Sequence, residues 1–139
     1  MKRFLALFLC TIMMLGLIGC SVDYVTRYGI KEVTIHTSII SSRRYYLDEK
    51  DDINRFFDNF KILDANFVYT ATMDFDPSVE LYVGGDAAEI VVMFNNDEKV
   101  MLYITKNGTV YKQSSTEIVY TDSGAVDYTK MSTFLDKIK

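Results

Sequence analysis

The stretch AEIVVMFNNDEKVMLYITKNGTVYKQ, residues 88–113, decides the fold of this 139-residue chain. Apolar and polar side chains alternate along most of it, and a period of two residues is typical of half-buried strands. Polar residues interrupt the alternation twice, and Asn107-Gly108 in the second interruption is a strong hairpin signal. The sequence therefore predicts an antiparallel meander, with strands over 88–94, 99–105 and 110–113.

Amphipathic helices are predicted on both sides of this meander. Upstream, the apolar spacing predicts a helix over about 49–62, with Asp48 as its N-cap. Its apolar face consists of Ile53, Phe56, Phe57, Phe60 and Leu63. Downstream, a second helix is predicted with Asp127 as its cap. The residues of its apolar face are Tyr128, Met131, Leu135 and Ile138.

Shorter segments with alternation complete the sheet. The further predicted strands are 32–39, 43–47, 65–73, 79–83 and 118–121. Short turns between strands favour antiparallel pairing, and two amphipathic helices need an apolar sheet face to cover. We therefore predict one α+β domain over residues 32–139. It has a mostly antiparallel sheet of five to seven strands and two amphipathic helices packed on one face.

The charge of the chain argues against two classes of partner. The formal net charge is −4, and removal of residues 1–19 leaves 13 basic and 19 acidic residues, a charge of −6. Nucleic-acid binding needs clustered Lys and Arg, so no nucleic-acid partner is expected. An anionic lipid surface would not attract such a domain either.

The N-terminus has the pattern of a secretory signal. A basic head, Met1-Lys2-Arg3, precedes 15 uncharged and mostly apolar residues, 4–18. As a helix this run would span about 22 Å, which is short of a hydrocarbon core of roughly 30 Å. Small residues follow it, as they do at a cleavage site.

The end of this run, Leu17-Ile18-Gly19-Cys20, resembles the lipobox of bacterial lipoproteins. The resemblance implies a diacylglyceryl group on the thiol of Cys20 and cleavage between Gly19 and Cys20. Residues 1–19 would then be the signal peptide and 20–31 a lipidated tether on the extracytoplasmic face of the cell membrane. Two acyl chains are enough for stable anchoring. An ordinary signal peptide and a retained membrane helix are the alternatives.

The globular part, residues 32–139, has a general layout similar to small lipoprotein domains of unassigned function in Gram-positive bacteria. This similarity implies a location in the cell envelope and no particular chemistry.

Few residues suit catalysis or metal binding. His36 is the only histidine, Cys10 lies in the removable segment, and Cys20 would be alkylated. Nucleophile–histidine catalysis, zinc or copper sites and a cofactor are therefore not expected. Asp74 and Asp76 suggest a calcium loop, but glycine and glutamate are missing at the positions where an EF-hand needs them. We predict that the chain is not an enzyme.

The most informative surface is the face of the meander opposite the predicted core. It would carry Tyr82, Val91, Met93, Met101, Tyr103 and Tyr111. Aromatic side chains with polar tips and flexible methionines are enriched at interfaces. Plain cross-strand packing, or cover by residues 24–28 or 114–124, is the structural alternative.

The sequence therefore favours a membrane-anchored binding or accessory module of the cell envelope, whose partner is a protein, a peptide or a wall polymer. A structural subunit of an envelope complex and a small hydrolase are the other hypotheses.

Overall fold

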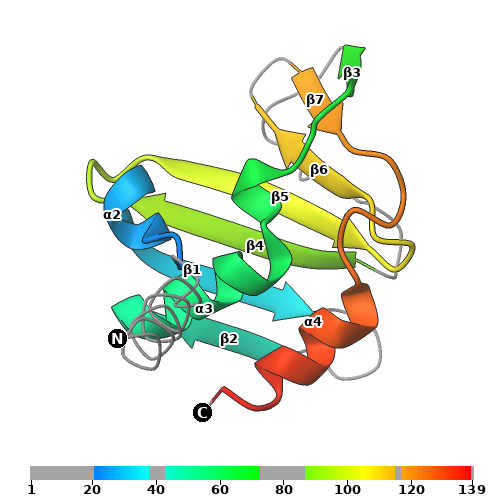
Figure 1. The fold of residues 1–139 in the computed structure, drawn as a ribbon. Coiled ribbons are helices and arrows are strands. Elements are labelled where there is room, and N and C mark those ends of the chain that lie inside the picture. The colour runs from blue at the N-terminus through cyan, green and yellow to red at the C-terminus, as the bar shows by residue number, and fades with distance from the viewer. Residues whose placement is uncertain (1–20, 38–42, 73–86, 115–116, 139) are drawn as a thin grey trace, which may run out of the picture.

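The computed structural model describes residues 21–37, 43–72, 87–114 and 117–138 (Figure 1). The strands are β1 (Ile30–Thr37), β2 (Arg43–Leu47), β3 (Tyr69–Thr72), β4 (Ala87–Phe94), β5 (Lys99–Thr105), β6 (Val110–Gln113) and β7 (Glu117–Tyr120). The helices are α2 (Tyr24–Tyr28), α3 (Lys50–Phe60) and α4 (Tyr128–Leu135), with a 3-10 turn η1 (Ile62–Asp64).

Within the described residues the strands form one seven-stranded sheet, in the order β2-β1-β4-β5-β6-β7-β3. Every neighbouring pair is antiparallel, which confirms the predicted α+β class. The meander is β4-β5-β6, as the alternation predicts. Its second turn depends on Gly108, whose φ of 81° is left-handed and whose N–H donates to the Thr105 carbonyl over 2.8 Å.

One face of the sheet and the helices share a single hydrophobic core. The sheet contributes the fully buried side chains of Val33, Ile35, Ala88, Ile90, Val92, Leu102, Ile104 and Val110. Helices α3 and α4 contribute Ile53, Phe56, Phe57, Phe60, Met131 and Leu135. Figure 1 shows α2, α3 and α4 on the near side of the sheet. The hydrophobic effect is the dominant favourable term in folding, so this layer provides most of the driving force for the fold.

Helix α3 follows the predicted apolar face but differs at both ends. Its N-cap is Glu49 rather than Asp48, without a side-chain capping bond, because β2 ends at Leu47 and Asp48 lies in the connection. Its last residue is Phe60, because Lys61 turns left-handed with φ of 49° and closes the helix by donating to the Phe57 carbonyl over 2.7 Å.

Helix α4 begins as predicted. The carboxylate of its N-cap, Asp127, accepts a hydrogen bond from the backbone N–H of Lys130 over 2.9 Å. Just past its other end, the Asp136 carboxylate accepts from Arg43 over 2.7 Å and from the Tyr45 hydroxyl over 2.8 Å. These bonds join α4 to the β2 edge of the sheet.

The folded part starts earlier than the predicted boundary at residue 32. Much of the segment 20–31, predicted as a tether, forms helix α2 and the beginning of β1. Tyr24 is only 1% exposed and packs in the core. Five residues are too few for a helical period to be visible in the sequence, which is why the helix was not predicted.

Several predictions fall outside the described residues. They are the signal segment, Gly19 and Cys20, the strand over 79–83 with Tyr82, and the acidic pair Asp74 and Asp76. The strand predicted over 65–73 is present as the shorter β3.

Candidate functional site

The sheet face opposite the helices carries a row of paired side chains that crosses all seven strands. Directly paired residues of antiparallel strands point to the same face, so the register alone defines this row. From β2 to β3 it runs Arg44, His36, Glu89, Tyr103, Tyr111, Tyr120 and Tyr69. The last four residues are all tyrosines, and we call them the tyrosine row.

Three rings of the tyrosine row, those of Tyr111, Tyr120 and Tyr69, lie against one another. The centroids of Tyr111 and Tyr120 are 5.3 Å apart and those of Tyr120 and Tyr69 are 5.0 Å apart, with interplanar angles of 24° and 21°. Such offset pairs add about 0.5–1.5 kcal/mol each beyond their area burial. The row is therefore a pre-ordered aromatic surface, which would lose little conformational entropy on binding.

The outer residue of the row has a fixed hydroxyl group. The Tyr69 hydroxyl donates to the Asp122 carboxylate over 2.8 Å, and this bond raises the pKa of Tyr69. Tyr69 is 44% exposed, so one side of its ring remains accessible at the β3 edge.

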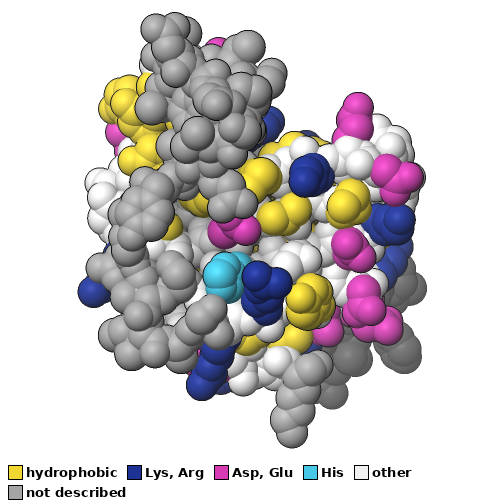
Figure 2. Space-filling view, turned by 180° about the vertical axis from the view of Figure 1, so that it is seen from behind, with side chains coloured by type: hydrophobic (Ala, Val, Ile, Leu, Met, Phe, Trp, Pro, Cys, Tyr) yellow, Lys and Arg dark blue, Asp and Glu magenta, His cyan; other side chains and the backbone are white. Residues whose placement is uncertain are grey.

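Apolar side chains on neighbouring strands extend the tyrosine row into a larger surface. We define the tyrosine face as the tyrosine row together with Tyr46, Val91, Met93 and Met101. Register places Tyr46 opposite Thr34, Thr34 opposite Val91, and Val91 opposite Met101. Tyr46 is 67% exposed and Met93 and Met101 are half-buried. Figure 2 shows this side of the molecule, where hydrophobic side chains lie among acidic and basic ones.

The β1–β2 part of the same face is polar. His36 lies between Arg44 and Glu89 in the row, which places one residue of each charge sign next to the histidine. These charged side chains lie beside the aromatic ones on the same face of the sheet.

The residues predicted for the outer face of the meander lie on that face wherever the structure describes them. Met93, Met101, Tyr103 and Tyr111 are all on the sheet face opposite the helices, whereas Tyr82 is outside the described residues. Tyr103 is only 4% exposed, so its ring contributes to packing more than to an accessible surface. The predicted alternative that residues 24–28 cover this face is wrong, because α2 packs into the core on the other side.

Three residues of the tyrosine face were missed by sequence reasoning. Tyr69 joins it through the pairing of β3 with β7, strands separated by more than 40 residues, and no local pattern reveals that pairing. Tyr120 joins it through the pairing of β7 with the preceding strand β6, where it lies opposite Tyr111. Tyr46 could have been found, because it alternates with Tyr45 and Leu47 in β2.

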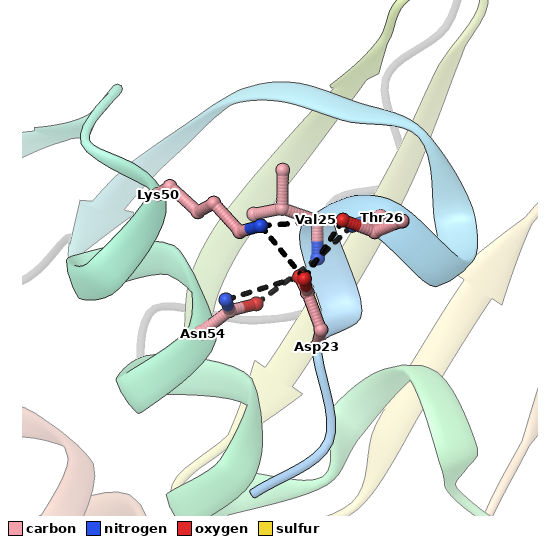
Figure 3. Close-up of polar contacts among 5 residues, drawn as sticks. All are labelled: Asp23, Val25, Thr26, Lys50 and Asn54. Carbon is pink, nitrogen blue, oxygen red and sulfur yellow. Dashed lines mark hydrogen bonds and ion pairs between the residues drawn. The ribbon is translucent and has the colours of Figure 1, made fainter.

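A second polar cluster holds α2 against α3, close to the predicted anchor (Figure 3). The Asp23 carboxylate caps α2 by accepting from the Thr26 N–H over 3.0 Å, and it pairs with the Lys50 ammonium over 2.7 Å. Asn54 donates to Asp23 over 3.2 Å and accepts from the Val25 N–H over 3.0 Å. The Lys50 hydrogen bond and then the cap lower the pKa of Asp23 far below its ordinary value.

Asp64 holds the other side of α2. Its carboxylate accepts from the hydroxyls of Tyr28 and Tyr24, the latter over 2.9 Å, and lies 3.7 Å from the Arg27 guanidinium. The Tyr28 hydrogen bond lowers the pKa of Asp64. Burial, with the same carboxylate beside it, raises the pKa of Tyr24 to about 12. Helix α2 is therefore fixed to the domain by polar contacts at both of its ends.

Two cavities lie away from the tyrosine face. One cavity of about 450 Å³ lies between the end of α2 and the β4–β5 turn, lined in part by Tyr28 and Phe94. Another of about 420 Å³ lies between α3 and α4, over Phe60 and Phe134. Neither has a residue of the tyrosine face in its lining.

The described residues lack two further features. No group of three or more His, Cys, Asp or Glu side chains there is arranged to hold a metal ion. None of the helices in the described part of the chain combines the length and the apolar character needed to cross a bilayer.

Comparison of the chain with protein-family models, with curated proteins and with solved structures finds no significant match.

Proposed function

We propose that this chain is a lipid-anchored extracytoplasmic binding module that holds a protein partner on its tyrosine face and carries out no catalytic step of its own. The observation that carries the proposal is the stacked tyrosine row with methionines beside it, on the sheet face that the helices leave uncovered.

The composition of the tyrosine face favours a protein as the partner. Tyrosine and methionine are enriched at protein interfaces, where a ring buries a large area and its hydroxyl finds a polar partner. Tyr46 and Tyr69 stand most exposed, at opposite edges of the sheet, with Val91 and Met101 between them. Neither cavity described above has a residue of the tyrosine face in its lining, and a small ligand usually needs a concave site.

The proposed location at the membrane rests on the N-terminal sequence pattern. The lipobox-like Leu17-Ile18-Gly19-Cys20 supports lipidation of Cys20 and retention at the extracytoplasmic side of the membrane. The net negative charge of the remaining chain favours a covalent lipid over electrostatic attraction as the means of attachment.

The binding proposal is tested with substitutions at the two most exposed rings. The double variant Tyr46→Ala and Tyr69→Ala should lose most of the partner protein that copurifies with the wild type from detergent-extracted membranes. Because both rings are substantially exposed, its unfolding free energy should change by only about 1 kcal/mol.

A matched control lies on the opposite side of the molecule. The double variant Lys130→Ala and Thr133→Ala changes two exposed residues of α4 and should keep the partner. Equal copurification with both double variants would contradict a binding role for the tyrosine face.

Lipid anchoring through Cys20 is tested separately. Cys20→Ala should leave the chain uncleaved or release it from the membrane, whereas Cys10→Ala should be processed as the wild type is. If Cys20→Ala were processed and retained at the membrane as the wild type is, lipidation at this residue would be excluded.

A further inference from the structure

We infer that the lipidated domain has a fixed orientation on the membrane. The α2 end of the sheet lies against the lipid headgroups, and the tyrosine row lies at the end away from them. This inference rests on the proposed function, because it takes Cys20 as the point of lipid attachment. The surface that meets the headgroups is formed by α2 and the neighbouring β4–β5 turn.

The chain between the lipid and the fold is very short. Only Ser21 and Val22 separate Cys20 from Asp23, the N-cap of α2. Val22 already packs against the hydrophobic core. Two residue steps from Cys20 to Val22 span at most about 7 Å even when fully extended, so the lipid has little freedom relative to α2.

Helix α2 itself has little freedom to move. Asp23 contacts Lys50 and Asn54 of α3 at one end of α2, and Asp64 accepts hydrogen bonds from the two tyrosines of α2. Because the tether is short and the helix is held rigidly, the position of the lipid limits the orientation of the whole domain.

The neighbours of α2 define one end of the sheet. Gly29 follows α2, and its carbonyl accepts from the Asn95 N–H in the β4–β5 turn over 2.8 Å. Ile30 at the start of β1 pairs with Phe94 at the end of β4. Figure 1 shows α2, the start of β1 and the β4–β5 turn together at the left end of the sheet.

The tyrosine row crosses the sheet near the opposite end. His36 and Glu89 belong to the row, and His36 lies six residues after Ile30 along β1. At about 3.3 Å per residue the row is therefore about 20 Å from the α2 end. A domain that rests on its α2 end thus presents the tyrosine row away from the bilayer.

Three cations at this end are already paired within the domain. The cations Arg27, Lys31 and Lys50 form ion pairs with Asp64 at 3.7 Å, Asp97 at 3.2 Å and Asp23 at 2.7 Å. Their charge is therefore partly compensated before any headgroup approaches, and the inference takes the length of the tether as the feature that sets the orientation.

The test compares two exposed positions in the turns at either end of β5. Glu98 lies in the β4–β5 turn and Lys106 in the β5–β6 turn. Glu98→Cys and Lys106→Cys are introduced singly into the full chain, and the mature lipidated protein is labelled with a thiol-reactive fluorophore; the Cys20 thiol is blocked by its lipid. The protein is placed in vesicles of phosphatidylethanolamine and phosphatidylglycerol that contain a headgroup-spin-labelled lipid as quencher.

We expect loss of fluorescence from the label at position 98 and unchanged fluorescence from the label at position 106. Equal quenching at the two positions, or stronger quenching at 106, would overturn the inference. A protein that fails to float with the vesicles would instead overturn the proposed anchor; flotation is therefore measured first, and quenching is compared only for protein that floats.

A linker variant separates the tether from other causes of orientation. Ten Gly and Ser residues inserted between Ser21 and Val22 would reach about 17 Å on average. The difference between positions 98 and 106 should then disappear. If it persisted in full, the short tether would not be what orients the domain.

Discussion

At the residue scale, Gly108 shows how one position joins two parts of the chain. Its φ of 81° suits the β5–β6 turn, and a Cβ added there would lie 2.2 Å from the Val126 carbonyl oxygen. The segment before α4 crosses directly over the turn, where the Val126 N–H donates to the Gly108 carbonyl over 3.1 Å. Glycine is therefore required here by close approach as well as by backbone conformation.

Gly108→Ala should accordingly destabilise the protein more than Gly124→Ala. Both glycines have positive φ, but a Cβ at Gly124 would meet no atom within 4 Å. Gly124→Ala should cost about 1 kcal/mol for the left-handed backbone alone, and Gly108→Ala at least about 2 kcal/mol because backbone must also move. Urea unfolding measures both. Equal losses would show that the approach of Val126 carries no energetic cost.

Asp64 makes stability depend on pH on the acid side. Its pKa in the folded protein is lowered from the ordinary value of 3.8, chiefly by the Tyr28 hydrogen bond, so the folded state binds this proton less readily than the unfolded state. The stability it contributes is therefore complete above about pH 4 and is lost as the pH falls through the lowered pKa.

Asp64→Asn should remove the pH-dependent part of the stability that the Asp64 carboxylate contributes. The variant should be less stable than the wild type at about pH 7, and the difference should shrink as the pH falls through the lowered pKa of Asp64, where the wild-type carboxylate also loses its charge. Thermal unfolding across this range measures it. A difference that stays constant with pH would mean that the Asp64 charge plays no part in holding α2.

At the element scale, α2 is the shortest α-helix in the described part of the chain and is held by several polar contacts. Asp23 caps it, pairs with Lys50 and accepts from Asn54. A five-residue helix has too few backbone bonds to persist alone, so its order depends on these contacts and on the burial of Tyr24.

Asp23→Ala should therefore raise amide hydrogen exchange in α2 while the amides of β4 and β5 keep their protection. Asp23→Asn serves as the matched variant, because an asparagine oxygen still caps the helix but has no charge for Lys50. We expect Asp23→Asn to loosen α2 less than Asp23→Ala does. Equal loosening by the two variants would show that the ion pair matters more than the cap.

Some of these elements can be predicted from the local sequence, whereas the pairing of distant strands cannot. The meander, the apolar face of α3 and the Asp127 cap are local signals with a period or a turn residue, and all three are present. The pairing of β7 with β3 and that of β1 with β4 are long-range, so no pattern in the sequence reveals them. As a result, only part of the tyrosine face was predicted, because Tyr69 joins the row through the first of these pairings.

At the scale of the whole molecule, the two faces of the sheet differ, and so do its two ends. One face holds the core with the helices, and the other carries the tyrosine face. One end holds α2, next to the proposed lipid on Cys20, and the tyrosine row lies near the other end. In this proposal the chain is a short-tethered module that presents an aromatic surface to a protein outside the cell.

The most direct measurement is site-specific photo-crosslinking in intact cells. A benzoylphenylalanine is placed at position 46 on the tyrosine face, and at Thr133 on α4 as the control. Tyr46 is 67% exposed and Thr133 is also exposed, so both positions tolerate the larger side chain. Our account predicts one discrete protein adduct from position 46 and none from position 133. Adducts from position 133 alone, or none from either position, would contradict a binding role for the tyrosine face.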